Sequence, residues 1–145
     1  MEHWELVARE SIRDLVARYN ANGDAGRFDP LLELFSDDAV MELPGRLCEG
    51  RAAIRAMFEE IAQRTGGDAG AARFIRHFTA THQIDIEGPG DARGRAYYMV
   101  VTERGPDHWG RYVDRYRRQG DRWYFAHRKV SVDAAVPGGW GADEA

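Results

Sequence analysis

Two residues far apart in the sequence, Asp24 and His77, have the side chains of a general-base pair. A histidine in a pocket can accept a proton from a ligand when a carboxylate binds its far ring nitrogen, fixes the tautomer and stabilises the imidazolium that forms. Asp24 follows a predicted helix, and His77 lies early in a predicted strand. If the fold brings the two together, they form a base.

Both residues also have ordinary structural explanations. Aspartate is common in turns because its side chain accepts hydrogen bonds from nearby backbone N–H groups, which explains Asp24 without a function. The helix dipole does not explain Asp24, because it mildly disfavours a carboxylate at a helix C-terminus. Strand alternation puts His77, Thr79, Thr81 and Gln83 on one face, and Phe78, Ala80, His82 and Ile84 on the other. One histidine per face excludes a pair of metal ligands on this strand. Either face could line a pocket, so His77 is a pocket residue in one case and a surface residue in the other.

An amphipathic helix is predicted ahead of Asp24. Apolar residues recur at three- and four-residue steps from Trp4 to Tyr19, and Gly23 is the expected stop signal. A second, short helix is predicted next, because Asp29 supplies an N-cap side chain and Pro30 fits the first helical position. These helices predict a polar corner close to Asp24.

The remaining chain is predicted to add one more helix and a strand meander. A strand is expected over residues 39–43, and a third helix after Gly50 ends at the Gly66-Gly67 pair. Four β-rich segments follow with short Gly-containing connections, which favour antiparallel neighbours: 74–87, 93–104, 109–118 and 123–132. Long twisted strands curl, so we expect an α+β fold whose helices cover the concave face of a curved antiparallel sheet and enclose a pocket.

Composition limits the classes of function. The 145 residues fit one domain, 43% of them are hydrophobic, and the net charge of −4 with pI near 5.7 favours neither nucleic acid nor an anionic membrane as partner. The basic residues near the end of the chain are expected mostly to face solvent on their strands: Arg111, Arg115, Arg117, Arg118, Arg122, Arg128 and Lys129. Without a leader-like start or a long apolar run, we expect a cytoplasmic protein.

Other sites are not indicated by the sequence. Cys48 is the single cysteine, which excludes an internal disulfide, and we interpret it as a partly buried bystander rather than a nucleophile. No P-loop, dinucleotide fingerprint, serine elbow or zinc motif occurs, so no cofactor is required. We expect a domain over residues 1–133 and a loose C-terminal tail over 134–145, where Trp140 could pin the tail over an apolar surface.

Several stretches in order resemble the SnoaL-like branch of the nuclear transport factor 2 superfamily. They are 12–19, 24–31 (DAGRFDPL), the Asp37-Asp38-Ala39-Val40 strand start, 50–54, His77, 110–114 and the final 120–123. The resemblance covers the chain to about Asp133. It implies a cone of curved sheet and three helices around a deep cavity.

The resemblance also implies roles for individual residues. Scytalone dehydratase and the hexachlorocyclohexane dehydrochlorinase of this superfamily use an aspartate–histidine base, which falls on Asp24 and His77. Scytalone dehydratase has a second pocket histidine in its next strand, whereas the corresponding region here has no histidine and Arg104 falls near that place. Dehydration of the substrate of scytalone dehydratase is therefore not expected. The base position of ketosteroid isomerase is occupied by Leu43, which disfavours that mechanism.

Six further residues are predicted to contact the ligand. Similarity to scytalone dehydratase places Tyr112 at a substrate-contacting position, and Tyr112 shares a strand face with Asp114, which could equally pair with an arginine. Tyr19 falls where ketosteroid isomerase has an oxyanion donor, although its apolar stripe also fits core packing. The predicted binding set is Tyr19, Phe58, Tyr98, Val100, Arg104 and Tyr112.

The resulting hypothesis is a cofactor-independent lyase, either a dehydratase-like elimination or a related C–O or C–C cleavage, acting on a small apolar or aromatic molecule. One alternative is a non-catalytic ligand-binding or assembly module, and a second is an isomerase or cyclase that uses the same pocket. Exposed aromatic residues on the sheet predict a homodimer or homotrimer.

Overall fold

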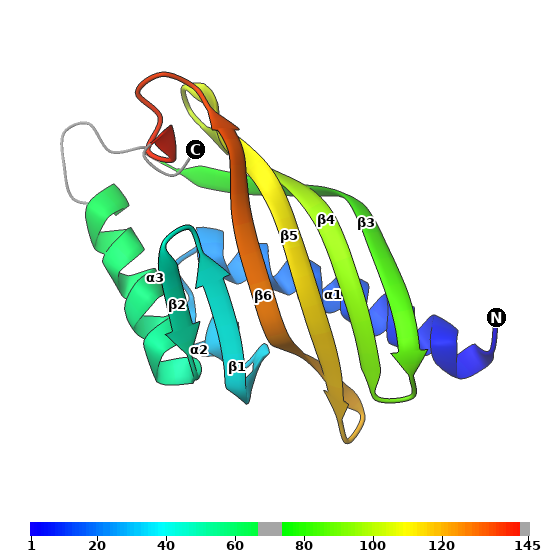
Figure 1. Ribbon diagram of the computed structural model, residues 1–145. Coiled ribbons are helices and arrows are strands. Elements are labelled where there is room, and N and C mark those ends of the chain that lie inside the picture. The colour runs from blue at the N-terminus through cyan, green and yellow to red at the C-terminus, as the bar shows by residue number, and fades with distance from the viewer. Residues whose placement is uncertain (67–73, 143–145) are drawn as a thin grey trace.

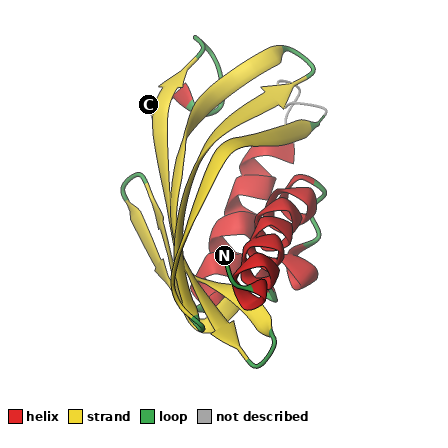
Figure 2. Ribbon diagram, turned by 90° about the vertical axis from the view of Figure 1, so that its right-hand side faces the viewer, coloured by secondary structure: helices red, strands yellow, loops and turns green. Residues whose placement is uncertain are grey.

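The computed structural model describes residues 1–66 and 74–142, and within them three α-helices pack against one face of a curved six-stranded sheet (Figures 1 and 2). The predicted α+β class and the curved sheet are confirmed. Among the described residues, no helix is long and apolar enough to span a membrane.

The helices are α1 (His3–Asp24), α2 (Phe28–Leu32) and α3 (Arg51–Gly66). A capping box between Glu2 and Glu5 starts α1, and its periodic apolar face is buried from Ala8 to Tyr19. Trp4 is 40% exposed, because the first turn of α1 extends past the sheet edge (Figure 1). The predicted N-cap of α2 is wrong by two residues, since Arg27 holds that position. Of the predicted Gly66-Gly67 stop, Gly67 lies outside the described residues.

The strands are β1 (Phe35–Leu43), β2 (Arg46–Glu49), β3 (Ile75–Gly88), β4 (Asp91–Thr102), β5 (Gly105–Gln119) and β6 (Arg122–Ala135). Their order in the sheet is β2-β1-β6-β5-β4-β3. The predicted antiparallel meander is present from β3 to β6. The sequence did not predict the short strand β2, nor that β1 joins the meander by pairing in parallel with β6.

A bulge in β3 makes the predicted alternation wrong beyond Ala80. The pairing of β3 with β4 shifts register between Ala80 and Gln83, and Thr81 inside the bulge has a positive φ of 54°. An extra residue in one strand reverses the side-chain alternation that follows it. His77 and His82 therefore both face the inner side of the sheet, one before Thr81 and one directly after it.

The core under the helices contains an ion pair as well as apolar side chains. Arg128 on β6 and Asp114 on β5 are directly opposite in the register, and both side chains are 0% exposed. The other cations of the predicted basic segment are exposed, so the expectation that most of them face solvent is confirmed, and Arg128 is the buried exception. Cys48 is buried at 2% exposure.

Candidate active site

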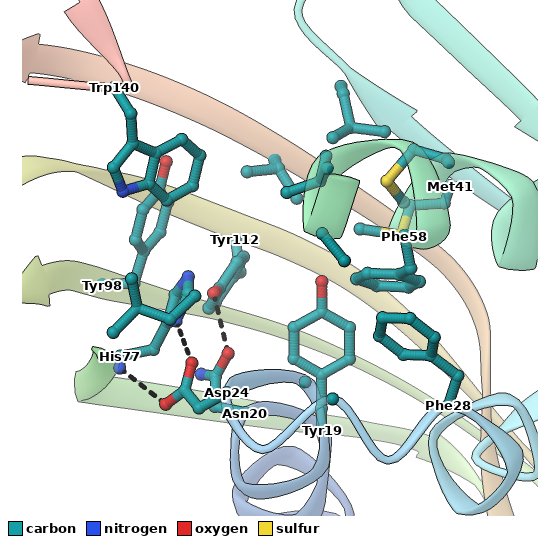
Figure 3. Close-up of a pocket in the computed structure, with 18 of the residues that line it drawn as sticks. Tyr19, Asn20, Asp24, Phe28, Met41, Phe58, His77, Tyr98, Tyr112 and Trp140 are labelled. Carbon is teal, nitrogen blue, oxygen red and sulfur yellow. Dashed lines mark hydrogen bonds and ion pairs between the residues drawn. The ribbon is translucent and has the colours of Figure 1, made fainter. Parts of the chain in front are cut away.

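A cavity of about 280 Å³ lies between the helices and the inner face of the sheet. Figure 3 shows its polar groups gathered at one end, around Asp24, His77 and Tyr112, whereas Phe28, Phe58 and Met41 lie at the other. A mostly apolar cavity with a few convergent polar groups is typical of a small-molecule site.

The structure brings Asp24 and His77 together inside this cavity. Asp24 Oδ1 lies 2.6 Å from His77 Nδ1, and Asp24 Oδ2 accepts the main-chain N–H of His77 at 2.9 Å. The two side chains are only 11% and 18% exposed. Because an ionised carboxylate only accepts hydrogen bonds, the proton lies on Nδ1, which leaves the Nε2 lone pair of neutral His77 available as a base.

The helix–strand contact is fixed at a second point. Asp24 is the last residue of α1, and Asn20, one turn earlier, donates from Nδ2 to Thr79 Oγ1 at 3.0 Å. Thr79 is two residues after His77, on the same face of β3. The end of α1 is thus held against β3 by two side-chain bridges, which set the direction of the Asp24 carboxylate.

Three tyrosines form one wall of the cavity. Tyr98 and Tyr112 stack with centroids 4.6 Å apart, and Tyr19 meets Tyr112 edge-on at 6.0 Å (Figure 3). Burial raises the pKa of Tyr19 to about 12 and that of Tyr112 well above its usual value, so both phenols stay protonated at neutral pH. The Tyr112 hydroxyl donates to Asn20 Oδ1 over a long 3.3 Å, so it could turn towards a ligand oxygen.

A second histidine, His108 on β5, also lines the cavity. Its Nδ1 lies 2.8 Å from Asp107 Oδ2, and its ring packs edge-on against Trp140 at 4.5 Å. His77 and His108 are both paired in register with Val100, so the two histidines flank this residue across three strands. Two histidine–aspartate pairs therefore lie at this end of the cavity, and of the second pair only His108 lines it.

Residues 136–142, here termed the C-terminal strap, bring Trp140 into the cavity lining next to His108. Asp107 holds the strap: its carbonyl accepts Val136 N–H at 2.9 Å, and its carboxylate accepts the N–H groups of Trp140 and Gly141, each at 3.2 Å. A Cβ at Gly141 would lie 2.4 Å from His108 Cγ. Only glycine allows the strap to approach so closely, and Trp140 becomes part of the cavity wall.

The predicted site residues divide into two groups. Asp24, His77, Tyr19, Phe58, Tyr98 and Tyr112 line the cavity. Val100 and Arg104 are absent from the lining among the residues that the structure describes. Val100 is fully buried in the core at 0% exposure, and Arg104 is exposed because it lies in the turn between β4 and β5. Tyr19 also packs against four aromatic rings, so it is both a core residue and a lining residue.

Sequence reasoning missed His108, Asn20 and the burial of Arg128. Strand alternation could have identified His108, because it lies an even number of residues before Tyr112 and Asp114 and so faces the same side of β5. The predicted strand began at residue 109, one residue after His108. Asn20 follows Tyr19 on the buried face of α1. In the parts of the chain that the structure describes, no group of three or more His, Cys, Asp or Glu could hold a metal ion.

Three helices on one face of a curved sheet, with a pocket between them, are the architecture of the nuclear transport factor 2-like class. Residues 4–129 match the model of the SnoaL-like domain, and the chain belongs to this family. A search of curated proteins gives no match.

Solved structures show the same fold. A candidate scytalone dehydratase from Novosphingobium aromaticivorans has a TM-score of 0.80 and 21% identity, over 94% of this chain and 91% of that one. LinA has a TM-score of 0.79 and 15% identity, over 93% of each chain. A protein from Novosphingobium aromaticivorans described as NTF2-like with a cystatin-like fold has a TM-score of 0.71 and 26% identity, over 93% of this chain and 86% of that one.

Proposed function

We propose that the protein is a cofactor-independent lyase in which His77 is the general base and Asp24 orients it. The observation that supports this most directly is the 2.6 Å contact between Asp24 Oδ1 and His77 Nδ1 inside the cavity. The names of two structural neighbours, a candidate scytalone dehydratase and LinA, are compatible with this class of reaction. General-base catalysis contributes typically about 10²–10⁴-fold to a rate.

The proposed step is an elimination next to a carbonyl group. His77 Nε2 takes the proton from the carbon beside the carbonyl, and the electron pair of that C–H bond forms a carbon–carbon double bond as the adjacent C–O bond breaks. The proton then passes from His77 to the departing oxygen, which leaves as water and restores neutral His77. The Tyr112 phenol donates a hydrogen bond to the carbonyl oxygen as charge develops there.

The shape of the cavity selects the substrate class. A volume of about 280 Å³ is at the small end of ligand sites and suits a molecule of one or two rings. Its far end is formed by Phe28, Phe58 and Met41, so the non-reacting part of the substrate is apolar or aromatic.

A panel of aryl β-hydroxy ketones tests the proposal. Loss of water produces a conjugated enone with a strong ultraviolet band, and deuterium uptake from solvent beside the carbonyl, measured by NMR, detects proton removal even without elimination. His77→Gln is expected to reduce both rates by about 10²–10⁴-fold. The matched control is His127→Gln, because His127 lies on β6 outside the cavity lining and pairs with Glu42. Equal rates for wild type and His77→Gln contradict the proposed base.

The same experiment separates the lyase from its rivals. A non-catalytic ligand-binding module would bind these ketones without exchange or elimination, and His77→Gln would leave its affinity almost unchanged. An isomerase or cyclase would exchange deuterium but release no water. The Asp24–His77 contact favours the two catalytic readings, because a binding module has no need of an oriented base.

A further inference from the structure

A buried ion pair lies directly beneath the tyrosine wall of the cavity. Arg128 Nε donates to Asp114 Oδ1 at 2.8 Å, and Arg128 Nη2 donates to Asp114 Oδ2 at 3.0 Å. Both side chains are 0% exposed. Neither residue is among the lining residues, so any effect of the pair on a ligand has to act through the side chains between them.

Those intervening side chains are aromatic rings. The Arg128 guanidinium carbon lies 3.8 Å from the ring centre of Tyr112 and 4.2 Å from that of Tyr19, and both tyrosines line the cavity. Phe125 covers the guanidinium at 4.5 Å. The cation therefore contacts two rings that line the cavity, and Tyr98 stacks on Tyr112 with centroids 4.6 Å apart.

The two ends of the ion pair have different surroundings. Asp114 accepts the hydroxyl of Tyr116 at 2.8 Å, and that phenol oxygen lies 3.0 Å from His82 Nε2. Tyr116 and His82 are outside the lining that the described residues form. The positive end of the pair thus lies against the cavity wall, whereas the negative end points towards Tyr116 and His82.

A gain in folding stability alone does not explain this buried ion pair. The free energy lost when two charges leave water offsets much of the free energy gained from their attraction, and apolar residues of similar volume often make a protein equally stable. Arg128 Nη1 adds to that cost, because it is buried without a hydrogen-bond partner among the described residues. A fixed dipole in a water-poor environment, by contrast, acts strongly on charge nearby.

We propose that the Arg128–Asp114 pair is a positioning device that makes the cavity select ligands with an anionic oxygen, of the phenolate or enolate class. Arg128 acts through the rings of Tyr19 and Tyr112, with the Tyr112 hydroxyl as the group that reaches the ligand. The inference deepens the proposed lyase function, on which it rests, because removal of a proton beside a carbonyl produces an enolate. The Asp24 carboxylate in the same cavity is hydrogen-bonded to the ring and to the main chain of His77, which limits its electrostatic repulsion of an anionic ligand.

Binding of two probes of similar size tests the charge selectivity. The probes are 4-nitrophenolate, at a pH where the phenolate dominates, and uncharged nitrobenzene. In Arg128→Met/Asp114→Asn, which removes both charges and keeps an acceptor for Tyr116, phenolate affinity is expected to fall about tenfold while nitrobenzene affinity stays within about twofold. Arg128→Lys, which keeps the cation, is expected to retain most of the selectivity.

The variant Asp114→Asn tests whether the positive charge of Arg128 is what favours an anionic ligand. This variant removes the counter-ion and leaves the Arg128 charge, so it is expected to bind 4-nitrophenolate more tightly than wild type does. Weaker phenolate binding by Asp114→Asn, or equal losses of both probes in the double variant, overturns the proposal. His77→Gln is expected to keep the phenolate preference while losing deuterium exchange, so failure of the charge selectivity and failure of the lyase function give different results.

Discussion

Asp24→Asn is expected to disable His77 by changing its tautomer. Asp24 Oδ2 accepts the His77 main-chain N–H at 2.9 Å, so the asparagine oxygen has to occupy that position. The asparagine NH₂ then faces His77 Nδ1, where Asp24 Oδ1 lies at 2.6 Å in the native protein. An NH₂ group only donates, so Nδ1 becomes the acceptor and the ring proton moves to Nε2, the atom that has to act as the base.

The expected magnitude is close to the whole contribution of a general base. A base contributes typically about 10²–10⁴-fold, which corresponds to roughly 3–5 kcal/mol in the activation free energy. The substitution changes no volume and leaves the hydrogen bond to the main chain in place, so the fold is expected to persist. The loss should appear in kcat/KM for deuterium exchange in the ketone panel.

Two measurements check this reasoning. Nitrogen-15 NMR of the imidazole reports which ring nitrogen carries the proton, and the kinetic assay reports the rate. Asp14→Asn on the same helix is the matched control, because Asp14 is exposed and pairs with Arg18 at 2.6 Å. An Asp24→Asn protein with wild-type kcat/KM, or one whose His77 still carries its proton on Nδ1, refutes the argument.

Three further predictions concern the strap and the core. Gly141→Ala places a Cβ 2.4 Å from His108 Cγ and should displace the strap. Acrylamide quenching of Trp140 fluorescence, measured as the difference from Trp140→Phe, should therefore rise. The control Gly90→Ala should have no effect, because a Cβ at Gly90 meets no atom within 4 Å. Burial lowers the pKa of His82, so the unfolded chain binds that proton more readily and stability should fall as the pH drops through about 6.5. Urea unfolding at about pH 7.5 and pH 5.5 should show a smaller decline for His82→Gln, and parallel declines would contradict this. Arg128→Met leaves Asp114 buried without its partner and should cost about 3–5 kcal/mol, or roughly 6–20 °C in Tm, most of which Arg128→Met/Asp114→Asn should recover. A single variant as stable as the double variant would show that the charge of Asp114 is not the cause.

Local patterns in the sequence determined the elements and much of the site. The apolar spacing of α1 records which helix face is buried, and strand alternation placed Tyr112 and Asp114 on one face of β5. These features are readable because helix and strand periodicity depend only on neighbouring residues. The proposed base was also accessible, since the order of the motifs resembles a family in which Asp24 and His77 have equivalents.

Tertiary structure alone decided which face of β3 looks into the cavity and what lies behind the cavity wall. The bulge at Thr81 depends on the pairing of β3 with β4, so residue parity within β3 could not show that His77 and His82 share a face. The burial of Arg128 depends on Asp114 directly opposite on β5 and on the aromatic rings around it. Cross-strand register and the partners of a charge are set by segments distant in sequence, and only the folded chain brings them together.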